Sequence, residues 1–123
     1  MTPTEFELIR QSGLEKWSKP EKIKTIKEAR EWWDKKGSTP CSFCRNFKTE
    51  DEIWSRVVLC TPCSLINGEY GCMPTFNYLS NMFVWEEPKP TIARFHKKSA
   101  IIKQKIQKTR YLKRFEDIEF KGA

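Results

Sequence analysis

Residues 40–72, PCSFCRNFKTEDEIWSRVVLCTPCSLINGEYGC, contain all five cysteines of the chain. Four of these cysteines form two C-x2-C pairs, with fifteen residues between the pairs. A C-x2-C turn directs two thiolates toward one point, and two such turns complete a tetrahedral shell with Zn–S distances of ~2.3 Å. The spacing therefore predicts one Zn²⁺ ion bound by Cys41, Cys44, Cys60 and Cys63.

Four sulfur ligands fill the shell and leave no position for water, so the predicted zinc is structural, and its binding free energy is part of the folding free energy. An iron–sulfur cluster is one alternative, and reduced, buried cysteines without a metal are the other. The fifth cysteine, Cys72, lies nine residues after Cys63. We expect Cys72 to be a buried apolar thiol, and the alternative is that it replaces one of the four ligands.

The cysteine segment also resembles a set of small four-cysteine zinc-type proteins of phages, prophages and related mobile elements. The resemblance rests on CSFCRNF, CTPCSL and GCMPTFNYL, preceded by the Trp-containing AREWWDKKGSTPC, and covers roughly residues 20–85. It departs from the family at Ser64, where proline is usual, and in the long segment between the pairs. Because the role of that family is largely undefined, the resemblance implies metal binding and a viral or mobile-element origin, and it assigns no reaction.

Length and composition indicate one soluble domain. The chain has 123 residues, of which 32% are charged, and we expect a single domain over residues 1–123. No apolar run approaches the ~18–20 residues that cross a bilayer. The N-terminal residues lack the basic and apolar segments of a secretory signal, so we expect no membrane association and a cytoplasmic location, in the host cell if the protein is viral. That compartment is reducing, which disfavours disulfides.

Two helices are predicted before the cysteines. Residues 4–13 form a short helix that begins at an N-capping Thr4 and ends at Gly13. Residues 18–37 form a longer helix capped by Ser18. Its apolar stripe at helical spacing consists of Ile23, Ile26, Ala29 and Trp33.

After the first cysteine pair, the β-branched and aromatic residues 53–59 predict a strand. Residues 75–85 have the apolar spacing of a short helix, and residues 86–90, EEPKP, are a break. A long helix is predicted from Thr91 to about Phe115.

The expected fold is therefore mostly α, with a small α+β fold as the alternative. Residues 1–37 supply the N-terminal helices, and residues 38–87 form the zinc-binding module. Residues 91–118 carry the basic C-terminal helix. We expect the helices to pack around a single four-cysteine zinc knuckle.

Positive charge is concentrated in the last part of the chain. The net charge is +7 overall, and it divides into +2 over residues 1–40, −2 over residues 41–90 and +7 over residues 91–123. From Arg94 through Phe115 there are nine Lys or Arg and no acidic residue. Attraction to phosphate is therefore expected from the C-terminal helix.

Projected at 100° per residue, that helix has an apolar stripe and cations on both flanks of it. The stripe consists of Ile92, Phe95, Ser99, Ile102, Ile106 and Thr109. The residues predicted to bind nucleic acid or another partner are Arg94, Lys97, Lys98, Lys105, Lys108, Arg110 and Arg114. Tyr111, Leu112 and Phe115 lie off the stripe, and they are expected to bind a partner, to dimerise or to dock on the N-terminal helices.

The sequence argues against an enzyme. His96 is the only histidine, and we interpret it as a surface residue of the basic helix rather than a metal ligand. The acidic run at residues 50–52 is interpreted as a solvated loop rather than a magnesium site. There is no Gly-rich phosphate loop and no Ser-His-Asp or Cys-His pattern.

Together these features predict a non-enzymatic zinc-binding protein that contacts nucleic acid, DNA or RNA, through its basic helix. The alternative is a virus-encoded inhibitor or modulator that binds an acidic protein surface of a host complex, such as defence or transcription machinery. A membrane-surface helix and a solubilising charged helix are the remaining interpretations.

Overall fold

The computed structural model describes residues 1–47 and 72–123. The predicted strand at residues 53–59, the acidic run at residues 50–52 and the cysteines Cys60 and Cys63 lie outside these ranges. Within them the chain is helical and has no strand, which confirms the mostly α prediction. The elements are α1 (Pro3–Ser18), a 3-10 turn (Lys19–Lys22), α2 (Ile26–Trp32), a π turn (Trp33–Gly37), α3 (Ser42–Phe47), α6 (Met73–Trp85), α7 (Ile92–Lys108) and a second 3-10 turn (Lys113–Asp117).

Helix α1 differs from the predicted helix at both ends. Its N-cap is Thr2, whose hydroxyl accepts a hydrogen bond from the Glu5 backbone N–H at 3.1 Å, while the Glu5 carboxylate accepts one from the Thr2 N–H at 2.8 Å. This capping box lies two residues before the predicted one, so the assignment of Thr4 as the cap was wrong. Gly13 does not end the helix but lies buried inside it.

Gly13 lies where another part of the chain approaches α1 closely. A Cβ atom at this position would be 3.3 Å from Ile106 Cδ1 and 3.4 Å from Phe43 Cε2. The absence of a side chain therefore lets α7 and the Phe43 ring pack directly against the backbone of α1. The glycine was interpreted as a helix stop because glycine has both uses, and sequence alone does not distinguish them.

The predicted helix at residues 18–37 is interrupted. Ser18 ends α1, and Ile23 is extended after the 3-10 turn. Helix α2 then begins with Thr25 as its N-cap, whose hydroxyl accepts from the Glu28 N–H at 3.2 Å. Gly37 ends the following π turn, as predicted.

The second half of the chain agrees better with the sequence. Helix α6 covers the predicted residues 75–85 and begins two residues earlier, and the break follows it. Helix α7 begins at Ile92 with Thr91 as its N-cap but ends at Lys108, several residues before the predicted end near Phe115. It ends there because Thr109 has an extended backbone, and the Thr109 hydroxyl donates to the Lys105 carbonyl oxygen at 2.8 Å.

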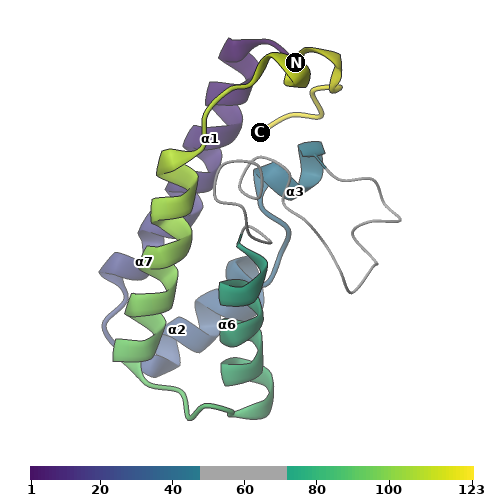
Figure 1. Ribbon diagram of the computed structural model, residues 1–123. Coiled ribbons are helices and arrows are strands. Elements are labelled where there is room, and N and C mark those ends of the chain that lie inside the picture. The colour runs from purple at the N-terminus through teal and green to yellow at the C-terminus, as the bar shows by residue number, and fades with distance from the viewer. Residues whose placement is uncertain (48–71) are drawn as a thin grey trace.

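Helix α7 lies at the centre of the packing. It contacts α1, α2 and α6, and Figure 1 shows α1 and α7 side by side along the length of the molecule, with both chain ends at the same end. The predicted apolar stripe of α7 is largely confirmed, because Phe95, Ser99, Ile102, Ile106 and Thr109 are buried and Ile92 is half-buried. Burial of this stripe supplies the hydrophobic stabilisation that joins the helices.

Aromatic rings form two clusters in this core. At the end near the chain termini, the Phe6 ring contacts Phe43, Phe47, Tyr111 and Phe115 at centroid separations of 5.7–6.3 Å. At the other end, Trp33 contacts Phe83 at 5.5 Å, and Phe83 contacts Phe95 at 5.8 Å. Tyr111 and Phe115 were expected to bind a partner, to dimerise or to dock on the N-terminal helices. Their contacts with Phe6 confirm the third alternative, because Phe6 belongs to α1.

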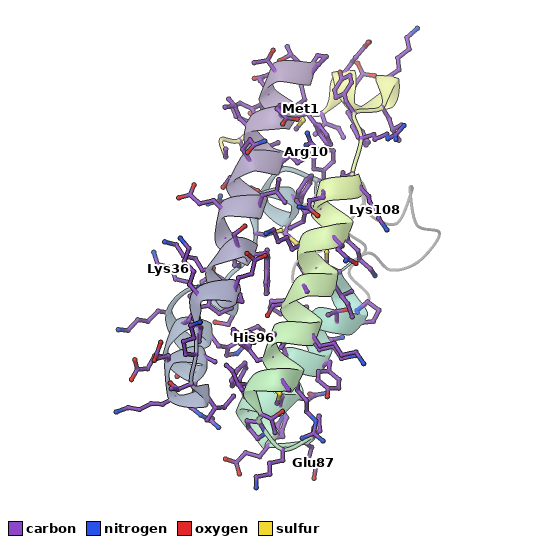
Figure 2. All side chains as sticks on the ribbon, turned by 90° about the vertical axis from the view of Figure 1, so that its left-hand side faces the viewer. Met1, Arg10, Lys36, Glu87, His96 and Lys108 are labelled. Atoms are coloured by element: carbon purple, nitrogen blue, oxygen red, sulfur yellow. The ribbon has the colours of Figure 1, made fainter. Side chains whose placement is uncertain are left out.

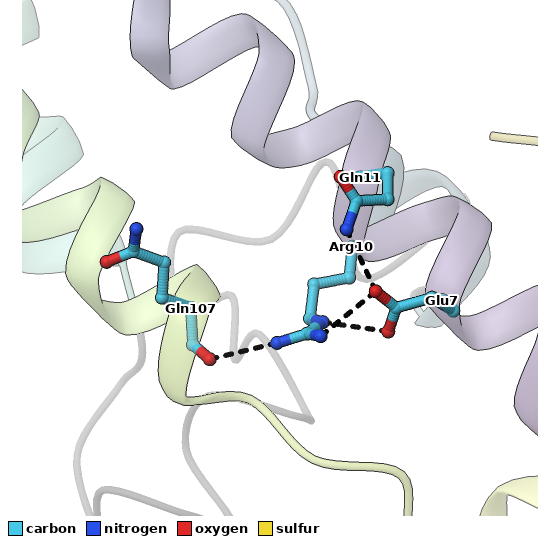
Figure 3. Close-up of polar contacts among 4 residues, drawn as sticks. All are labelled: Glu7, Arg10, Gln11 and Gln107. Carbon is cyan, nitrogen blue, oxygen red and sulfur yellow. Dashed lines mark hydrogen bonds and ion pairs between the residues drawn. The ribbon is translucent and has the colours of Figure 1, made fainter.

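Polar contacts also join α1 to the end of α7 (Figure 3). The Arg10 guanidinium donates to both oxygens of the Glu7 carboxylate at 2.9 Å and to the Gln107 carbonyl oxygen at 3.1 Å. Gln11 donates to the same carboxylate at 2.9 Å. The bonds from Arg10 and then Gln11 lower the pKa of Glu7. Arg10 thereby supplies a donor to one of the last carbonyl groups of α7, which have no partner within the helix.

Ser99 offers a test of the core. It is 1% exposed, and its hydroxyl has no hydrogen-bond partner in the part of the chain that the structure describes. We expect Ser99→Ala to raise the free energy of unfolding by about 1–2 kcal/mol, because a buried unpaired hydroxyl is costly and alanine favours the helix. Urea denaturation measures the change.

Thr109 is the matched control, because it is 3% exposed and its hydroxyl is bonded to Lys105. Thr109→Val replaces the hydroxyl with a methyl group and should lower the free energy of unfolding by about 1 kcal/mol, because the hydrogen bond is lost. Equal destabilisation by Ser99→Ala and Thr109→Val would contradict the assignment of Ser99 as unpaired.

Candidate metal centre and basic face

Cys41 and Cys44 lie together at the start of α3. The Cys41 carbonyl accepts from the Arg45 N–H at 3.1 Å, so Cys41 immediately precedes the first turn of the helix. A hydrogen bond with the Cys44 thiol and burial raise the pKa of Cys41, and the backbone N–H of Cys44, which donates to the Cys41 sulfur, acts in the opposite direction. The turn thus brings two sulfurs together, as the C-x2-C spacing predicts.

The other half of the predicted shell, Cys60 and Cys63, lies outside the described residues. Across residues 1–47 and 72–123, no group of three or more histidine, cysteine or acidic side chains is placed to hold a metal ion. The four-cysteine zinc site therefore stays a prediction. Cys41 and Cys44 lie close enough together to supply two of its four ligands.

Helix α3 is held from two sides by buried polar side chains. The Ser42 hydroxyl donates to the Ile9 carbonyl oxygen on α1 at 2.7 Å. The Asn46 amide nitrogen donates to the carbonyl oxygens of Ser42 and Gly122 at 2.8 and 2.7 Å, and its oxygen accepts from the Lys121 N–H at 2.6 Å. These bonds fix the helix that carries the cysteine pair against α1 and the C-terminal segment.

Sequence reasoning missed Ser42 and Asn46. The available signal was that they stand four residues apart, each followed by a phenylalanine, so they share a helix face beside the apolar one. Polar residues next to a core stripe are usually exposed, and only the fold shows that these two are 2% and 3% exposed.

A cation lies near the cysteine pair. The Lys16 ammonium donates to the Thr39 carbonyl oxygen at 2.6 Å and lies 5.3 Å from the centre of the Trp17 ring. Burial lowers the pKa of Lys16, and the charges of Cys41 and Cys44 act in the opposite direction. Four thiolates around Zn²⁺ carry a net negative charge, which a neighbouring ammonium group would offset.

Cys72 is half-buried and directly precedes α6. Its side chain packs against the hydrophobic core, and its carbonyl accepts from the Phe76 N–H at 2.8 Å. This environment agrees with an apolar thiol, and the alternative role as a ligand is open because the cysteines it would join or replace lie outside the described residues.

The predicted binding cations differ in exposure. Arg94, Lys97, Lys108 and Arg110 are exposed, whereas Lys98 and Lys105 are half-buried. The Lys98 ammonium lies 4.3 Å from the centre of the Tyr78 ring on α6. The Arg114 side chain lies outside the described part of the structure. On the opposite flank of α7, Lys103 pairs with Glu21.

The solvent-facing ridge of α7 is less basic than the sequence suggested. Of the seven exposed residues of α7, three are the cations Arg94, Lys97 and Lys108, and four are neutral, namely Ala93, Ala100, Gln104 and Gln107. The cations of the predicted face lie mainly on the flank toward α6. Partner contacts that use these cations are therefore expected to involve α6 as well.

His96 is not the surface residue that the sequence suggested. It is half-buried, and its Nε2 lies 2.7 Å from the Ile23 carbonyl oxygen, to which it donates. In Figure 2 it lies on the side of α7 that faces the N-terminal helices. The bond joins α7 to the extended residue before α2, so we assign His96 a structural role.

No protein-family model, curated protein or solved structure matches the chain. The resemblance to small zinc-type phage proteins therefore stays a prediction. Among the described residues, the structure contains no helix that is long and apolar enough to cross a membrane.

The polar clamp at Asn46 can be tested with an isosteric change. Asn46→Asp replaces the donating nitrogen with an oxygen that faces the carbonyl oxygens of Ser42 and Gly122. We expect the free energy of unfolding to fall by about 2–4 kcal/mol, because the two carbonyl oxygens lose their donor and a buried carboxylate is taken out of water. Urea denaturation measures the loss, and Arg45→Gln on the exposed side of α3 should change stability by less than about 0.5 kcal/mol. An unchanged stability for Asn46→Asp would show that the clamp contributes little.

Proposed function

We propose that this chain is a non-enzymatic, zinc-binding protein that contacts nucleic acid through the cations of α7. The zinc is structural in this proposal, with Cys41, Cys44, Cys60 and Cys63 as ligands. It ties the residues between the two cysteine pairs to α3 and supplies no reaction. We accordingly expect nuclease assays with Mg²⁺ or Mn²⁺ to stay at background.

The observation that carries the nucleic-acid part is the division of α7 into a buried face and cationic flanks. Its apolar stripe is used in the core, and the side chains of Arg94, Lys97 and Lys108 are exposed, so they can reach a partner. Residues 91–123 contain ten Lys or Arg and three Asp or Glu. An exposed row of cations along a rigid helix suits contact with a phosphate backbone, which dominates the affinity of nucleic-acid binding.

The second candidate is a protein-directed modulator of a host complex. The four neutral residues of the exposed face, Ala93, Ala100, Gln104 and Gln107, favour it, because the centre of a protein–protein interface is depleted of charged side chains. The flanking cations would then pair with an acidic partner surface. The two candidates differ in salt dependence and in whether nuclease treatment releases the partner.

The metal is tested by composition. We expect the purified protein to carry about one zinc ion per chain, with Cys41→Ser, Cys44→Ser, Cys60→Ser and Cys63→Ser each losing the metal and much of the fold. Elemental analysis and circular dichroism measure both effects, and Cys72→Ser is the control that should keep the zinc. A folded protein without metal would remove the zinc proposal. Loss of zinc in Cys72→Ser, with retention in Cys60→Ser or Cys63→Ser, would show a different ligand set.

Phosphate contact is tested by salt. Each contact releases about one counterion, so three to five contacts give a slope of log affinity against log salt of roughly −2 to −4. We expect Lys97→Gln to make this slope shallower by about one unit and to weaken binding to all sequences alike. Lys103→Gln, the same change on the opposite, ion-paired flank, should leave the slope nearly unchanged. Equal slopes for the two variants would place the contact surface elsewhere.

A further inference from the structure

Trp85 has an unusual environment for a tryptophan in this protein. Trp17 and Trp33 are 2% and 3% exposed and belong to the core, whereas Trp85 is 72% exposed at the end of α6. A large aromatic surface left in water contributes little to the stability of the fold. Its position relative to the cations of α7 shows what it could bind.

Helix geometry places Trp85 on the exposed shoulder of α6 that adjoins α7. Tyr78 and Trp85 are seven residues apart, which puts them within about 20° of each other around the helix and ~10 Å apart along it. Tyr78 lies beside α7, because the Lys98 ammonium is 4.3 Å from the centre of the Tyr78 ring. The same shoulder of α6 therefore carries Tyr78 beside α7 and Trp85 two turns farther along.

The adjoining shoulder of α7 carries a row of cations. Arg94, Lys98 and Lys105 follow at intervals of four and seven residues, so they lie on one side of the helix, the side that meets Tyr78. Arg94 also donates to the Lys89 carbonyl oxygen at 2.8 Å, which holds its guanidinium near the loop that joins α6 and α7. Because α6 and α7 are in contact and Lys98 meets Tyr78 between them, the aromatic shoulder and the cationic shoulder adjoin each other.

The carboxylates that follow Trp85 do not dominate this surface. Glu86 lies 3.6 Å from the Arg30 guanidinium, so it turns toward α2 and is partly neutralised there. Glu87 lies in the loop at the end of the molecule farthest from Met1, as Figure 2 shows. The row of cations runs from that end along α7 and away from both carboxylates.

We propose that the α6–α7 surface binds single-stranded nucleic acid, with one base stacked on Trp85 and the phosphates alongside Arg94, Lys98 and Lys105. This inference rests on the proposed function and specifies its ligand. Tyr78 positions Lys98 and has that ammonium over its ring, so Trp85 is the stacking residue. Single strands satisfy both halves of the surface because their bases are free to stack on an aromatic ring while the backbone follows the cations. In a duplex the bases are already stacked inside.

The experiment compares labelled 16-nucleotide single strands with a duplex of the same sequence, by fluorescence anisotropy at ~50 mM salt, where phosphate contacts are strong. We expect Trp85→Ala to weaken single-strand binding by about 5- to 150-fold, the range that the loss of one stacked base produces. Duplex binding and the salt slope should stay within error, because stacking releases no counterions. Trp85→Phe should restore most of the affinity.

Leu8→Ala is the matched control, since Leu8 is another large exposed side chain, 51% exposed on α1. It should change neither affinity. Denaturation curves confirm that each variant is folded.

The outcomes separate the two proposals. If Trp85→Ala changes neither ligand's affinity, or weakens both equally, the stacking inference is overturned, and a salt slope that still responds to Lys97→Gln leaves the proposed function standing. If the wild-type protein binds neither oligonucleotide, both proposals fail and a protein partner leads.

Discussion

The close approach of α1 and α7 is the contact on which the other elements depend. It is possible because Gly13 leaves no side chain between the helices, so that Ile106 and the Phe43 ring reach the α1 backbone. Phe43 belongs to α3, which carries Cys41 and Cys44 at its start. One backbone contact therefore sets both the position of the basic helix and the position of the cysteine pair.

From that contact the core divides into two aromatic regions with different roles. The rings around Phe6 join α1, α3 and the C-terminal segment, whereas the rings around Phe83 join the Trp33 turn, α6 and α7. The first region supports the cysteine pair and the second supports the α6–α7 surface. Helix α7 contributes Phe95 to the second region, and its Ile106 lies with the Phe43 ring of the first region at Gly13. The apolar stripe of α7 therefore links the two regions.

Sequence reasoning succeeded where a segment is periodic and its neighbours along the chain decide its structure. The stripe of α7, the helix at α6 and the break between them follow from spacing and from Pro88 and Pro90. It was wrong at Thr4, Gly13 and Ser18, because a competing local signal, such as Thr2 with Glu5 or Thr25 with Glu28, has the same chemistry as the predicted one. When two neighbouring residues can both cap a helix, the local sequence does not determine which one does, because tertiary contacts decide where the helix begins.

The residues that shape the candidate sites could not be found from sequence for a related reason. Asn46 closes a contact with Gly122, 76 positions away, and Lys98 meets Tyr78 across a helix pair, so neither role has a local signature. The exposure of Trp85 is likewise a property of how α6 is turned, because the composition shows five tryptophans without showing which ones the core uses.

The two candidate sites are also expected to differ in their dependence on metal. Helix α3 is short, and among the described residues its contacts beyond α1 include the Asn46 bonds to residues 121–122 and the Phe47 ring contact with Phe115 at 5.0 Å. If the proposed zinc is bound, its loss is expected to loosen α3 and the C-terminal segment first. The α6–α7 surface has its own aromatic support from Trp33, Phe83 and Phe95, so its cations and Trp85 are expected to be less sensitive to the proposed metal. The proposed structural metal and the proposed binding surface are thus compatible within a single small core.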